Sequence, residues 1–468
     1  MPKVILINPC CRNIKGTTGL ALTMPPLGLA YLAAVLLKNK HQVQVIDAHL
    51  LNIRSENIAD AFLFQPDIVG ISTNIVSYNE AARCAERVKS IYAQVPILFG
   101  GPYSSSLAEV ILKKNSAVDA VVINEGEETL AEIAGSLGRK NIFENVQGVT
   151  YRAKDRIIRN ECRALIKNLD DIPIPAYQCL PDLRKYKSRS RADPVGYIIT
   201  SRGCPSRCTF CYRSFGTSWR PHSANRVVEE ICYLVKEYRI RQVDILDDNF
   251  TFDTDRAMAI LDLLEKRSLK IAINLQIGVR VDRVNEALLM RMRKAGVFKI
   301  GFGIESGDDN ILKRAKKDLN LDKAISLTKF ARSLGMITHG FFIIGLPGES
   351  AQSAMKTIDF SLKMNPHYAS FSVCVPLPGT EIFDEVKQKR QILVDVENGM
   401  ETGFFSLKPF FKLDAMSSQE TASYNEMAWR KFYLRPSKII DVLSTIKSMG
   451  ELKWLMRIIN ESLKVKFK

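Results

Sequence analysis

The amino-acid sequence predicts an α/β protein with two successive β/α units, a doubly wound parallel sheet and then a partial (β/α)6 barrel, followed by a helical C-terminal segment. Three observations support this fold class. Apolar runs alternate with helical patterns through residues 1–150 and again through 196–385. That alternation stops in residues 386–468. A chain of 468 residues also exceeds what one hydrophobic core usually supports, so we expect more than one domain.

In residues 1–150, short runs rich in Val and Ile are typical of strands that are buried on both faces of a parallel sheet. These runs are Val4–Asn8, Gln42–Ile46, Asp67–Ser72, Pro96–Gly100 and Val118–Ile123. The helical patterns between and after them are Leu27–Asn39, Glu56–Phe64, Asn79–Tyr92, Leu107–Lys113 and Glu128–Leu137. This alternation predicts a doubly wound sheet that binds its ligand at the carboxyl ends of the strands.

Turns at those carboxyl ends are candidates for the ligand-binding surface, because glycine lets the backbone approach a ligand closely. The candidate residues are Ser72, Thr73, Asn74, Gly100, Gly101, Pro102, Glu125, Gly126 and Glu127. No G-x-G-x-x-G pattern follows the first strand, so the sequence does not favour a dinucleotide as the ligand.

Residues 151–195 are expected to be a linker between the two units. Val146–Tyr151 and Asp155–Arg159 suit a small hairpin, and Leu169–Tyr177 contains two prolines without any periodicity. Prolines bias the chain toward extended structure, which is consistent with a crossing between domains.

Residues 196–385 repeat the β/α alternation. The expected strands are Gly196–Ser201, Gln242–Leu246, Ile271–Ile277, Phe298–Ile304, Thr338–Ile344 and Tyr368–Val375. The expected helices are Val227–Tyr238, Asp255–Lys266, Val284–Ala295, Leu321–Leu334 and Ala351–Met364. Because a closed barrel of this type has eight repeats, the sequence predicts an open (β/α)6 barrel with its active groups at the carboxyl ends of the strands.

Three cysteines, Cys204, Cys208 and Cys211, follow the first barrel strand within one short loop. Three thiolates are one fewer than a closed zinc site or a fully ligated four-iron cluster requires, so one iron of a cluster would remain open for another ligand. A zinc knuckle is the alternative. His222 is the nearest histidine, however, and no fourth ligand stands at finger-like spacing.

The cysteine spacing, with the aromatic Phe210 just before the last cysteine, resembles that of radical S-adenosylmethionine (SAM) enzymes. The resemblance implies a [4Fe-4S] cluster on Cys204, Cys208 and Cys211, with SAM on the open iron. Phe210 belongs to the same cofactor-binding motif.

Polar residues at three further strand ends suit the ammonium, carboxylate and ribose groups of SAM. By the same resemblance, Asp247 or Asp248 after the second strand contacts the amino group, and Glu305 after the fourth strand contacts the ribose. Gln276 and Arg280, near the third strand end, are further candidates for the carboxylate. A salt-bridge role for Arg280 stays open.

The segments PPLGLAYLAAVL, PDIVGIST, ILFGGPY and EGEETL resemble the cobalamin-binding domain that precedes many radical SAM domains. This resemblance implies a Rossmann-like domain that binds cobalamin on the turns named above. Some cobalamin proteins place a His on cobalt from an Asp-x-His-x-x-Gly motif. Asp47-Ala48-His49 lacks the Gly and follows the second strand, so we expect no protein His on cobalt, with His41 and His49 solvated.

Charge points to an anionic partner. The chain has 66 Lys and Arg against 50 Asp and Glu, a net charge of +16, and residues 430–468 alone carry a net of +7 with apolar residues at helical spacing. Such a segment either lies on a membrane interface or covers the barrel with a solvated face. No apolar run is long enough to span a membrane, and scattered cysteines indicate a reducing compartment. We expect a cytoplasmic protein, free or peripheral to the inner face of the membrane.

Together, the resemblances imply a radical SAM enzyme of the superfamily that includes anaerobic Mg-protoporphyrin ester cyclase and hopanoid methylases. Its 5′-deoxyadenosyl radical would serve to methylate or rearrange an unactivated carbon, and methylation is the favoured reaction. We expect an apolar or amphipathic substrate such as an isoprenoid, a lipid or a tetrapyrrole. We also expect an external electron donor such as flavodoxin or ferredoxin, and no nucleic acid.

Two alternatives stay open. A tRNA methylthiotransferase would suit the positive charge, but Cys10, Cys11 and Cys84 lack the spacing of the extra cluster in that family. A corrinoid carrier or sensor without catalysis is the other, and the three cysteines beside acidic strand ends argue against it.

Overall fold

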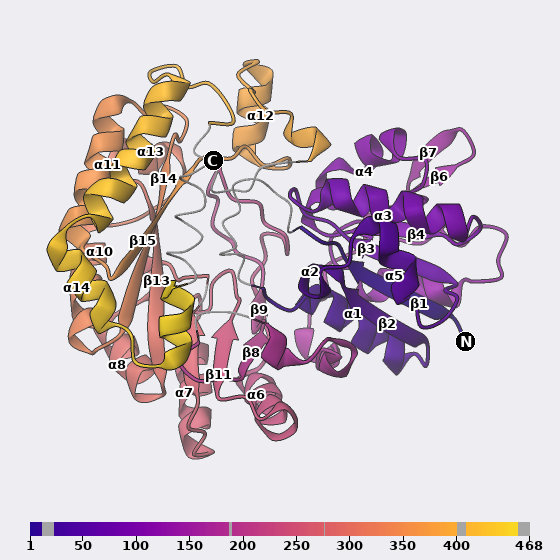
Figure 1. Ribbon diagram of the computed structural model, residues 1–468, viewed down its shortest axis with the longest axis horizontal. Helices are drawn as coiled ribbons and strands as arrows, with labels where there is room; N and C mark the ends of the chain where they lie inside the picture. Colours follow the sequence, from indigo (N-terminus) through magenta and orange to yellow (C-terminus); the bar gives the residue numbers. More distant parts are fainter. Residues whose placement is uncertain (12–22, 187–189, 276, 400–408, 457–468) are drawn as a thin grey trace.

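Two β/α units lie side by side in the computed structural model of the chain (Figure 1). The structure describes residues 1–11, 23–186, 190–275, 277–399 and 409–456. The N-terminal unit holds one twisted sheet, and the second unit holds a curved sheet with helices on its outer side.

The first sheet has seven strands in the order β2-β1-β3-β4-β5-β6-β7 within the described residues. Their bounds are β1 (Lys3–Asn8), β2 (Gln42–Asp47), β3 (Ile68–Ser72), β4 (Ile97–Gly100), β5 (Ala120–Val122), β6 (Val149–Ala153) and β7 (Arg156–Arg159). Strands β1 to β5 are parallel, and β6 and β7 are antiparallel. Because β1 lies between β2 and β3, the chain changes direction there, which opens a ligand crevice at the carboxyl ends.

The helices of this unit are α1 (Leu27–Lys38), α2 (Ala48–Leu51), α3 (Tyr78–Ile91), α4 (Pro102–Lys114) and α5 (Glu127–Gly135). One expected helix, Glu56–Phe64, is instead the 3-10 segment η1 (Ser55–Ala61). The side chain of Gln44 explains where it ends, because it donates to the Ala61 carbonyl at 2.8 Å and accepts from the Leu63 amide at 2.9 Å.

The expected hairpin is present as β6 and β7, but it belongs to the first sheet rather than to a free linker. The sheet therefore continues to Arg159, past the expected limit at residue 150. The following residues contact both units. The Ala176 amide donates to the Ala30 carbonyl at 3.0 Å, and the Tyr177 hydroxyl lies 2.7 Å from Glu230 Oε1.

The second unit is an open barrel of six parallel strands that are neighbours in sequence order, as predicted. They are β8 (Val195–Ile198), β11 (Gln242–Ile245), β12 (Ala272–Leu275), β13 (Val297–Glu305), β14 (Ile337–Ile344) and β15 (Tyr368–Val373). The helices are α6 (Ala224–Tyr238), α7 (Thr254–Lys266), α8 (Glu286–Lys294), α9 (Asp309–Arg314), α10 (Leu321–Ser333) and α11 (Ala351–Met364). Two short strands, β9 (Ser201–Arg202) and β10 (Arg220–Pro221), pair outside the barrel.

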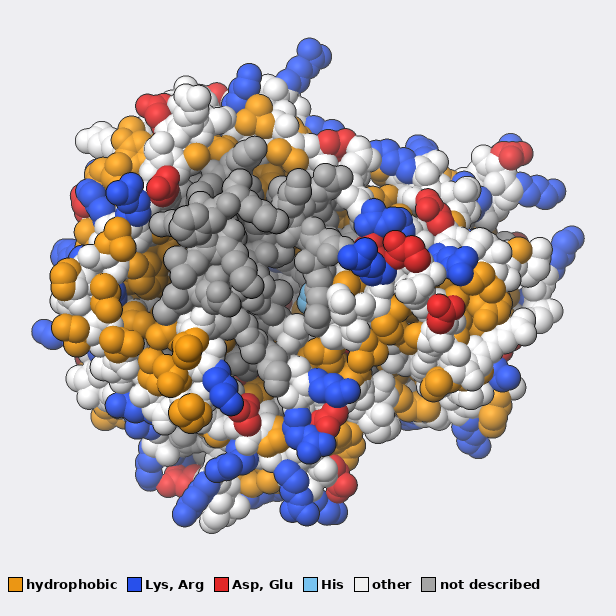
Figure 2. Space-filling view, in the orientation of Figure 1, with side chains coloured by type: hydrophobic (Ala, Val, Ile, Leu, Met, Phe, Trp, Pro, Cys, Tyr) orange, Lys and Arg blue, Asp and Glu red, His pale blue; other side chains and the backbone are white. Residues whose placement is uncertain are grey.

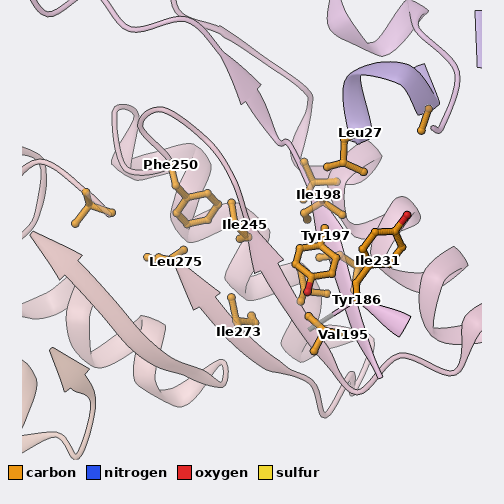
Figure 3. Close-up of a cluster of buried hydrophobic side chains, with 14 of the residues drawn as sticks. Leu27, Tyr186, Val195, Tyr197, Ile198, Ile231, Ile245, Phe250, Ile273 and Leu275 are labelled. Carbon is orange, nitrogen blue, oxygen red and sulfur yellow. The ribbon is translucent and has the colours of Figure 1, made fainter. Parts of the chain in front are cut away.

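One apolar core joins the two units. Ile198 of β8 and Ile245 of β11 belong to the same buried cluster as Leu27 of α1. Figure 3 shows Leu27 beside Ile198, where the first unit meets the first barrel strand. The units therefore share buried apolar surface instead of being connected only through a flexible crossing.

The C-terminal segment contains α12 (Glu381–Gln388), α13 (Ser418–Tyr433) and α14 (Pro436–Ser444). Helix α13 covers the open edge of the barrel at β15. The Trp429 indole donates to the Phe371 carbonyl at 3.0 Å, and the Tyr433 hydroxyl accepts from the Ala369 amide at 2.9 Å and donates to the Ala369 carbonyl at 2.7 Å. These contacts satisfy backbone groups that an edge strand otherwise leaves open to pairing with other chains.

Helix α14 is tied to the barrel by a buried cation. Lys438 donates to the Pro366 carbonyl at 2.7 Å and pairs with Asp441, which also pairs with Arg332 of α10. Part of the basic segment thus covers the barrel, which is one of the two arrangements that the sequence predicts. None of the described helices is long and apolar enough to cross a membrane.

Replacing Tyr433 by Phe should destabilise the protein, because it leaves both backbone groups of Ala369 without their partner. We expect a loss of about 1–3 kcal/mol in the free energy of unfolding, measured by urea denaturation. Tyr424→Phe on the same helix is the control, because the Tyr424 hydroxyl has no hydrogen bond within the described residues. Equal stability of the two variants would show that the edge contact contributes nothing.

Candidate functional site

A cavity of about 1200 Å³ opens at the carboxyl ends of β1, β3, β4 and β5 and faces the barrel. It exceeds the range of about 300–1,000 Å³ that suits drug-sized ligands, so it has room for a large cofactor. The predicted residues among its lining are Ser72, Asn74, Gly100, Gly101, Pro102, Glu125, Gly126 and Glu127. Barrel-side residues, including Arg202 and Phe215, complete the wall.

Thr73 is the exception among the predicted turn residues. It is buried behind the cavity wall, where its hydroxyl donates to the Gly100 carbonyl at 2.9 Å and also contacts Ser104. Thr73 is therefore not among the residues that line the cavity, and its contact with a ligand stays a prediction. Its side chain braces the neighbouring turn because the hydroxyl points into the protein rather than toward the cavity.

The two glycines of the second turn have different roles. Gly101 has a φ of +103°, and a Cβ there would lie 2.5 Å from the Thr73 carbonyl oxygen, so only glycine fits. Gly100 has no atom within 4 Å of the place where a Cβ would stand, and it lines the cavity. A bare backbone beside open space is what a large flat ligand such as a corrin ring requires, so this part of the chain fits cobalamin.

Glu125 and Glu127 line the cavity, but their carboxylates are engaged elsewhere. Arg202 donates to Glu125 at 2.8 Å and to Glu127 at 2.7 Å, and Arg220 donates to Glu125 at 2.8 Å. Burial alone raises the pKa of Glu125, but the hydrogen bonds from Arg220 and Arg202 outweigh it and lower the pKa below its ordinary value. The turn Glu125–Glu127 thus stays a predicted binding turn, but its two carboxylates serve the arginines and Gly126 offers bare backbone to the cavity.

His49 also differs from expectation. It is half-buried and lines the cavity, and its Nδ1 accepts a hydrogen bond from the Cys11 amide at 3.2 Å. Solvation was expected because the sequence does not show that α2 folds back beside β1. His41 is half-buried too, and burial lowers its pKa. Burial raises the pKa of Cys11 to about 12, so that thiol stays protonated at neutral pH.

The cysteine loop follows β9 and is held between two distant segments. The Thr209 amide donates to the Ala315 carbonyl at 3.0 Å, and the Ile382 amide donates to the Thr209 carbonyl at 3.1 Å. Cys208 is buried, Cys204 is half-buried and Cys211 is exposed. Phe210 packs against an apolar cluster that includes Ile382, so the structure gives it a packing contact.

The chemistry of the loop suits a cluster with one open iron. Three sulfur donors stand in one loop. Burial raises the pKa of Cys208, and the nearby cations Lys317 and Arg280 offset part of that rise. The surrounding protein also raises the pKa of Cys211 to about 12, although its side chain reaches solvent. Neighbouring cations favour the thiolates that a metal needs as ligands. Within the described part of the chain, no three Cys, His, Asp or Glu side chains already converge as ligands of one ion.

The two aspartates at the second strand end have separate environments. Asp247 is 2% exposed and accepts from the Thr200 amide and hydroxyl, each at 2.5 Å, and from the Ser201 hydroxyl at 2.7 Å. Its carboxylate supports the turn before the cysteine loop, so the expected contact with a ligand narrows to Asp248. Asp248 is exposed at the surface of the site, yet the surrounding protein and the charge of Asp247 raise its pKa to about 6.

Two of the remaining predicted SAM contacts, Glu305 and Arg280, lie near Cys208. Glu305 has a φ of +72° and pairs with the buried Lys317 at 3.1 Å. Arg280 pairs with Asp282 at 2.8 Å, the structural role that the sequence left open. Gln276 lies outside the described residues. Sequence reasoning missed Lys317, Arg202 and Arg220, because a single basic residue carries no pattern that marks it as buried.

Comparisons with known proteins agree with this geometry. A family profile described as the radical SAM superfamily matches residues 198–361, and a B12 binding domain profile matches residues 17–134. An uncharacterized methyltransferase of Pyrococcus horikoshii is 34% identical over 94% of each chain. Cytidylyl-2-hydroxyethylphosphonate methyltransferase of Streptomyces wedmorensis is 30% identical, covering 85% of this chain and 84% of its own.

A relative named in the expected superfamily is also found. Anaerobic magnesium-protoporphyrin IX monomethyl ester cyclase of Rubrivivax gelatinosus is 25% identical, covering 92% of this chain and 77% of its own. Among solved structures, the radical SAM methyltransferase TsrM of Kitasatospora setae, with cobalamin and a [4Fe-4S] cluster bound, has a TM-score of 0.73. At 14% identity, with 100% of this chain and 99% of that chain covered, this likeness shows the fold.

The two aspartates should respond differently to replacement by asparagine. Asp247→Asn should lower the free energy of unfolding by about 1.5–3 kcal/mol, because it weakens buried hydrogen bonds to a charged acceptor. Asp248→Asn should instead raise the free energy of unfolding at pH 7, because it removes a carboxylate charge that the surrounding protein and Asp247 disfavour.

Asp248 should also give stability a pH dependence. Its folded pKa of about 6 lies above the ordinary value of 3.8, so the folded state holds a proton that the unfolded state releases. In the cofactor-free protein, the contribution of Asp248 should fall as pH rises from about 4 to about 6. Asp248→Asn should remove that slope in urea denaturation series, whereas an unchanged slope would contradict this assignment.

Proposed function

Because the chain belongs to the radical SAM superfamily and carries a B12 binding domain, we propose that it transfers a methyl group from cobalamin to an unactivated carbon of its substrate. The cofactors of this family are a [4Fe-4S] cluster, SAM and cobalamin. One observation carries the proposal. The cavity is walled by the turns of the first unit and by Arg202, which stands two residues before Cys204.

The described residues divide the work of binding. Cys204, Cys208 and Cys211 would hold the cluster, and Asp248 would accept from the SAM amino group. Glu305, with Lys317 beside it, would face the ribose. When bound, the cluster and SAM supply a 5′-deoxyadenosyl radical and cobalamin supplies the methyl group. The chain itself positions these groups and holds them away from bulk water.

The cavity turns would hold the corrin ring through backbone rather than through charge. Gly100 and Gly126 line the cavity without a side chain, and the neighbouring glutamates are paired with arginines. We keep the expectation that no protein His binds cobalt. The test is electron paramagnetic resonance of the cobalamin-loaded protein. Nitrogen hyperfine splitting from His49 would contradict the expectation that no protein His binds cobalt.

The methylthiotransferase alternative has less support. Its extra cluster would need Cys10, Cys11 and Cys84 as thiolates. Cys84 is fully buried in the apolar core, where burial raises its pKa, and Cys11 stays protonated for the same reason. Their surroundings favour protonated thiols rather than ligands.

Two variants should separate the cofactors. Replacing Cys204, Cys208 and Cys211 together by Ala should remove the roughly four irons expected for such a cluster while cobalamin is retained. Gly100→Val should retain the iron but lose cobalamin, because the valine side chain would enter the cavity without meeting the backbone. Both are measured as iron and cobalamin per chain after anaerobic reconstitution.

Gly135→Ala is the control for the glycine variant, because its Cβ also meets open space but lies outside the cavity. The triple cysteine variant should no longer cleave SAM reductively to 5′-deoxyadenosine. Iron retained by the triple variant, or cobalamin bound normally by Gly100→Val, would contradict the corresponding half of the proposal.

We infer further that the substrate is apolar or amphipathic and is met at an anionic membrane surface from the cytoplasmic side, with a flavodoxin- or ferredoxin-like protein as electron donor. The support is an exposed apolar patch on the C-terminal segment. Its members, 51% to 69% exposed, are Leu434, Ile439, Ile440, Leu443, Met449 and Met456. Figure 2 shows apolar side chains gathered at the lower left, over α14.

Exposed cations belong to the same C-terminal segment as this patch. Arg430, Lys431, Lys447 and Lys453 are exposed, whereas Lys438 is used inside the protein. Each exposed cation adds about 1 kcal/mol of attraction to an anionic leaflet. The segment therefore has one side on the barrel and the other in solvent, which supports the proposed membrane contact. Residues 457–468, which complete the basic segment, lie outside the described residues.

Membrane binding should depend on the apolar patch. The intact chain should co-sediment with anionic vesicles, and Ile440→Glu with Leu443→Glu should abolish that binding. Leu63→Glu is the control, because Leu63 is 82% exposed in the first unit and lies far along the sequence from the patch. Tight binding to tRNA at equal salt, without vesicle binding, would contradict the substrate class. So would turnover of a water-soluble nucleotide-linked substrate of the kind named for the Streptomyces relative.

A further inference from the structure

Four charged side chains from the two units meet in one buried group beside the cavity, which we call the interdomain cluster. Its members are Glu125 and Glu127 from the turn after β5, and Arg202 and Arg220 from the short strands β9 and β10. All four side chains are buried, and Arg202 is only 2% exposed. With two carboxylates and two guanidinium groups, the cluster carries no net charge.

Arg202 occupies the centre of the cluster. One terminal nitrogen lies 2.8 Å from Glu125 Oε1, and the other lies 2.7 Å from Glu127 Oε1. The guanidinium carbon lies 4.9 Å from the ring centre of Tyr31 and 5.3 Å from that of Phe215. A planar fork that serves two carboxylates fixes orientation as well as distance, which a lysine does not do.

The cluster also ties in the chain between the units. Glu125 accepts from the Ile166 amide at 2.9 Å, and Arg220 donates to the Ile166 carbonyl at 2.6 Å. Arg220 further donates to the Phe215 carbonyl at 3.0 Å. A cavity turn, the crossing segment and the start of the cysteine loop are therefore held by one set of hydrogen bonds.

The path from Arg202 to the first cysteine is short and stiff. Only Gly203 stands between Arg202 and Cys204. Gly203 has a φ of +83°, and a Cβ there would collide with the Ser218 carbonyl oxygen. Little chain, and no residue with room for another conformation, therefore separates the interdomain cluster from the cysteine loop.

Stability alone does not explain such a cluster. Removing several charges from water costs about as much as their attraction returns, so apolar residues of similar size are often as stable. Buried charged groups are better explained where they select one geometry among several. The position of this cluster, between the cavity and the cysteine loop, indicates which geometry is selected.

We propose that Arg202 is a positioning residue that sets the separation and orientation of the cobalamin cavity relative to the cysteine loop through Glu125 and Glu127. The identity of the two groups so positioned, a corrinoid and an iron–sulfur cluster, rests on the function proposed above. The mechanical link between the turn and the loop rests on the contacts alone.

The test is the magnetic coupling between the two cofactors in the loaded protein. With cobalamin as Co(II) and the cluster reduced, electron paramagnetic resonance of the wild type should show one well-defined spin–spin splitting. Arg202→Lys keeps the charge but cannot hold both carboxylates in a fork. We expect it to retain iron and cobalamin while losing the single splitting in favour of a broad distribution.

Arg226→Lys is the matched control. Arg226 pairs with the buried Glu230 of the same helix at 2.9 Å. Glu230 also accepts from Tyr177 of the crossing segment, but this ion pair links no cavity turn to the cysteine loop. This variant should keep the wild-type splitting. A purely structural role for Arg202 would lower stability without changing the splitting of the folded, loaded molecules.

A second variant guards against misfolding. Arg202→Met combined with Glu127→Gln removes one positive and one negative charge together and leaves Glu125 paired with Arg220. It too should lose the single splitting, and in the cofactor-free chain the turn after β5 and the β9 strand should exchange amide hydrogens faster. A wild-type splitting in either folded, loaded variant overturns the proposal. Absence of cobalamin or cluster from the wild type would instead overturn the proposed function.

Discussion

The fork of Arg202 between Glu125 and Glu127 is the interaction on which the rest of the site depends. Each unit follows the ordinary rules of β/α folds. Those rules do not determine how two such units are oriented relative to each other. The shared apolar core brings the units together, but apolar contact is non-directional. Directional bonds between buried charges supply the missing orientation, and they do so at the wall of the cavity.

Strands such as β1 and β3 were predictable because each is a buried run rich in Val and Ile, which is typical of a parallel sheet. The position of the cavity followed from strand order, since ligands of parallel sheets bind at the carboxyl ends. The six-stranded barrel followed in the same way from six apolar runs between helical patterns. These features depend on residues that are close in sequence.

The use of individual polar side chains was not predictable, because it depends on partners far along the chain. Glu125 meets Arg202 across 77 residues, and Asp247 meets Thr200 across 47. A sequence pattern can place a carboxylate at a strand end, but it does not show whether another segment already occupies it. The same reason explains the burial of Thr73 and the position of His49 at the cavity.

The cover over β15 has a consequence for synthesis of the chain. Trp429 and Tyr433, which occupy the backbone of that strand, are made well after the strand itself. A nascent chain on the ribosome therefore carries a complete sheet with a bare edge until α13 emerges. Bare edges pair readily with other chains, so this interval is when the protein most needs a chaperone. Truncations before α13 would make that vulnerable stage permanent.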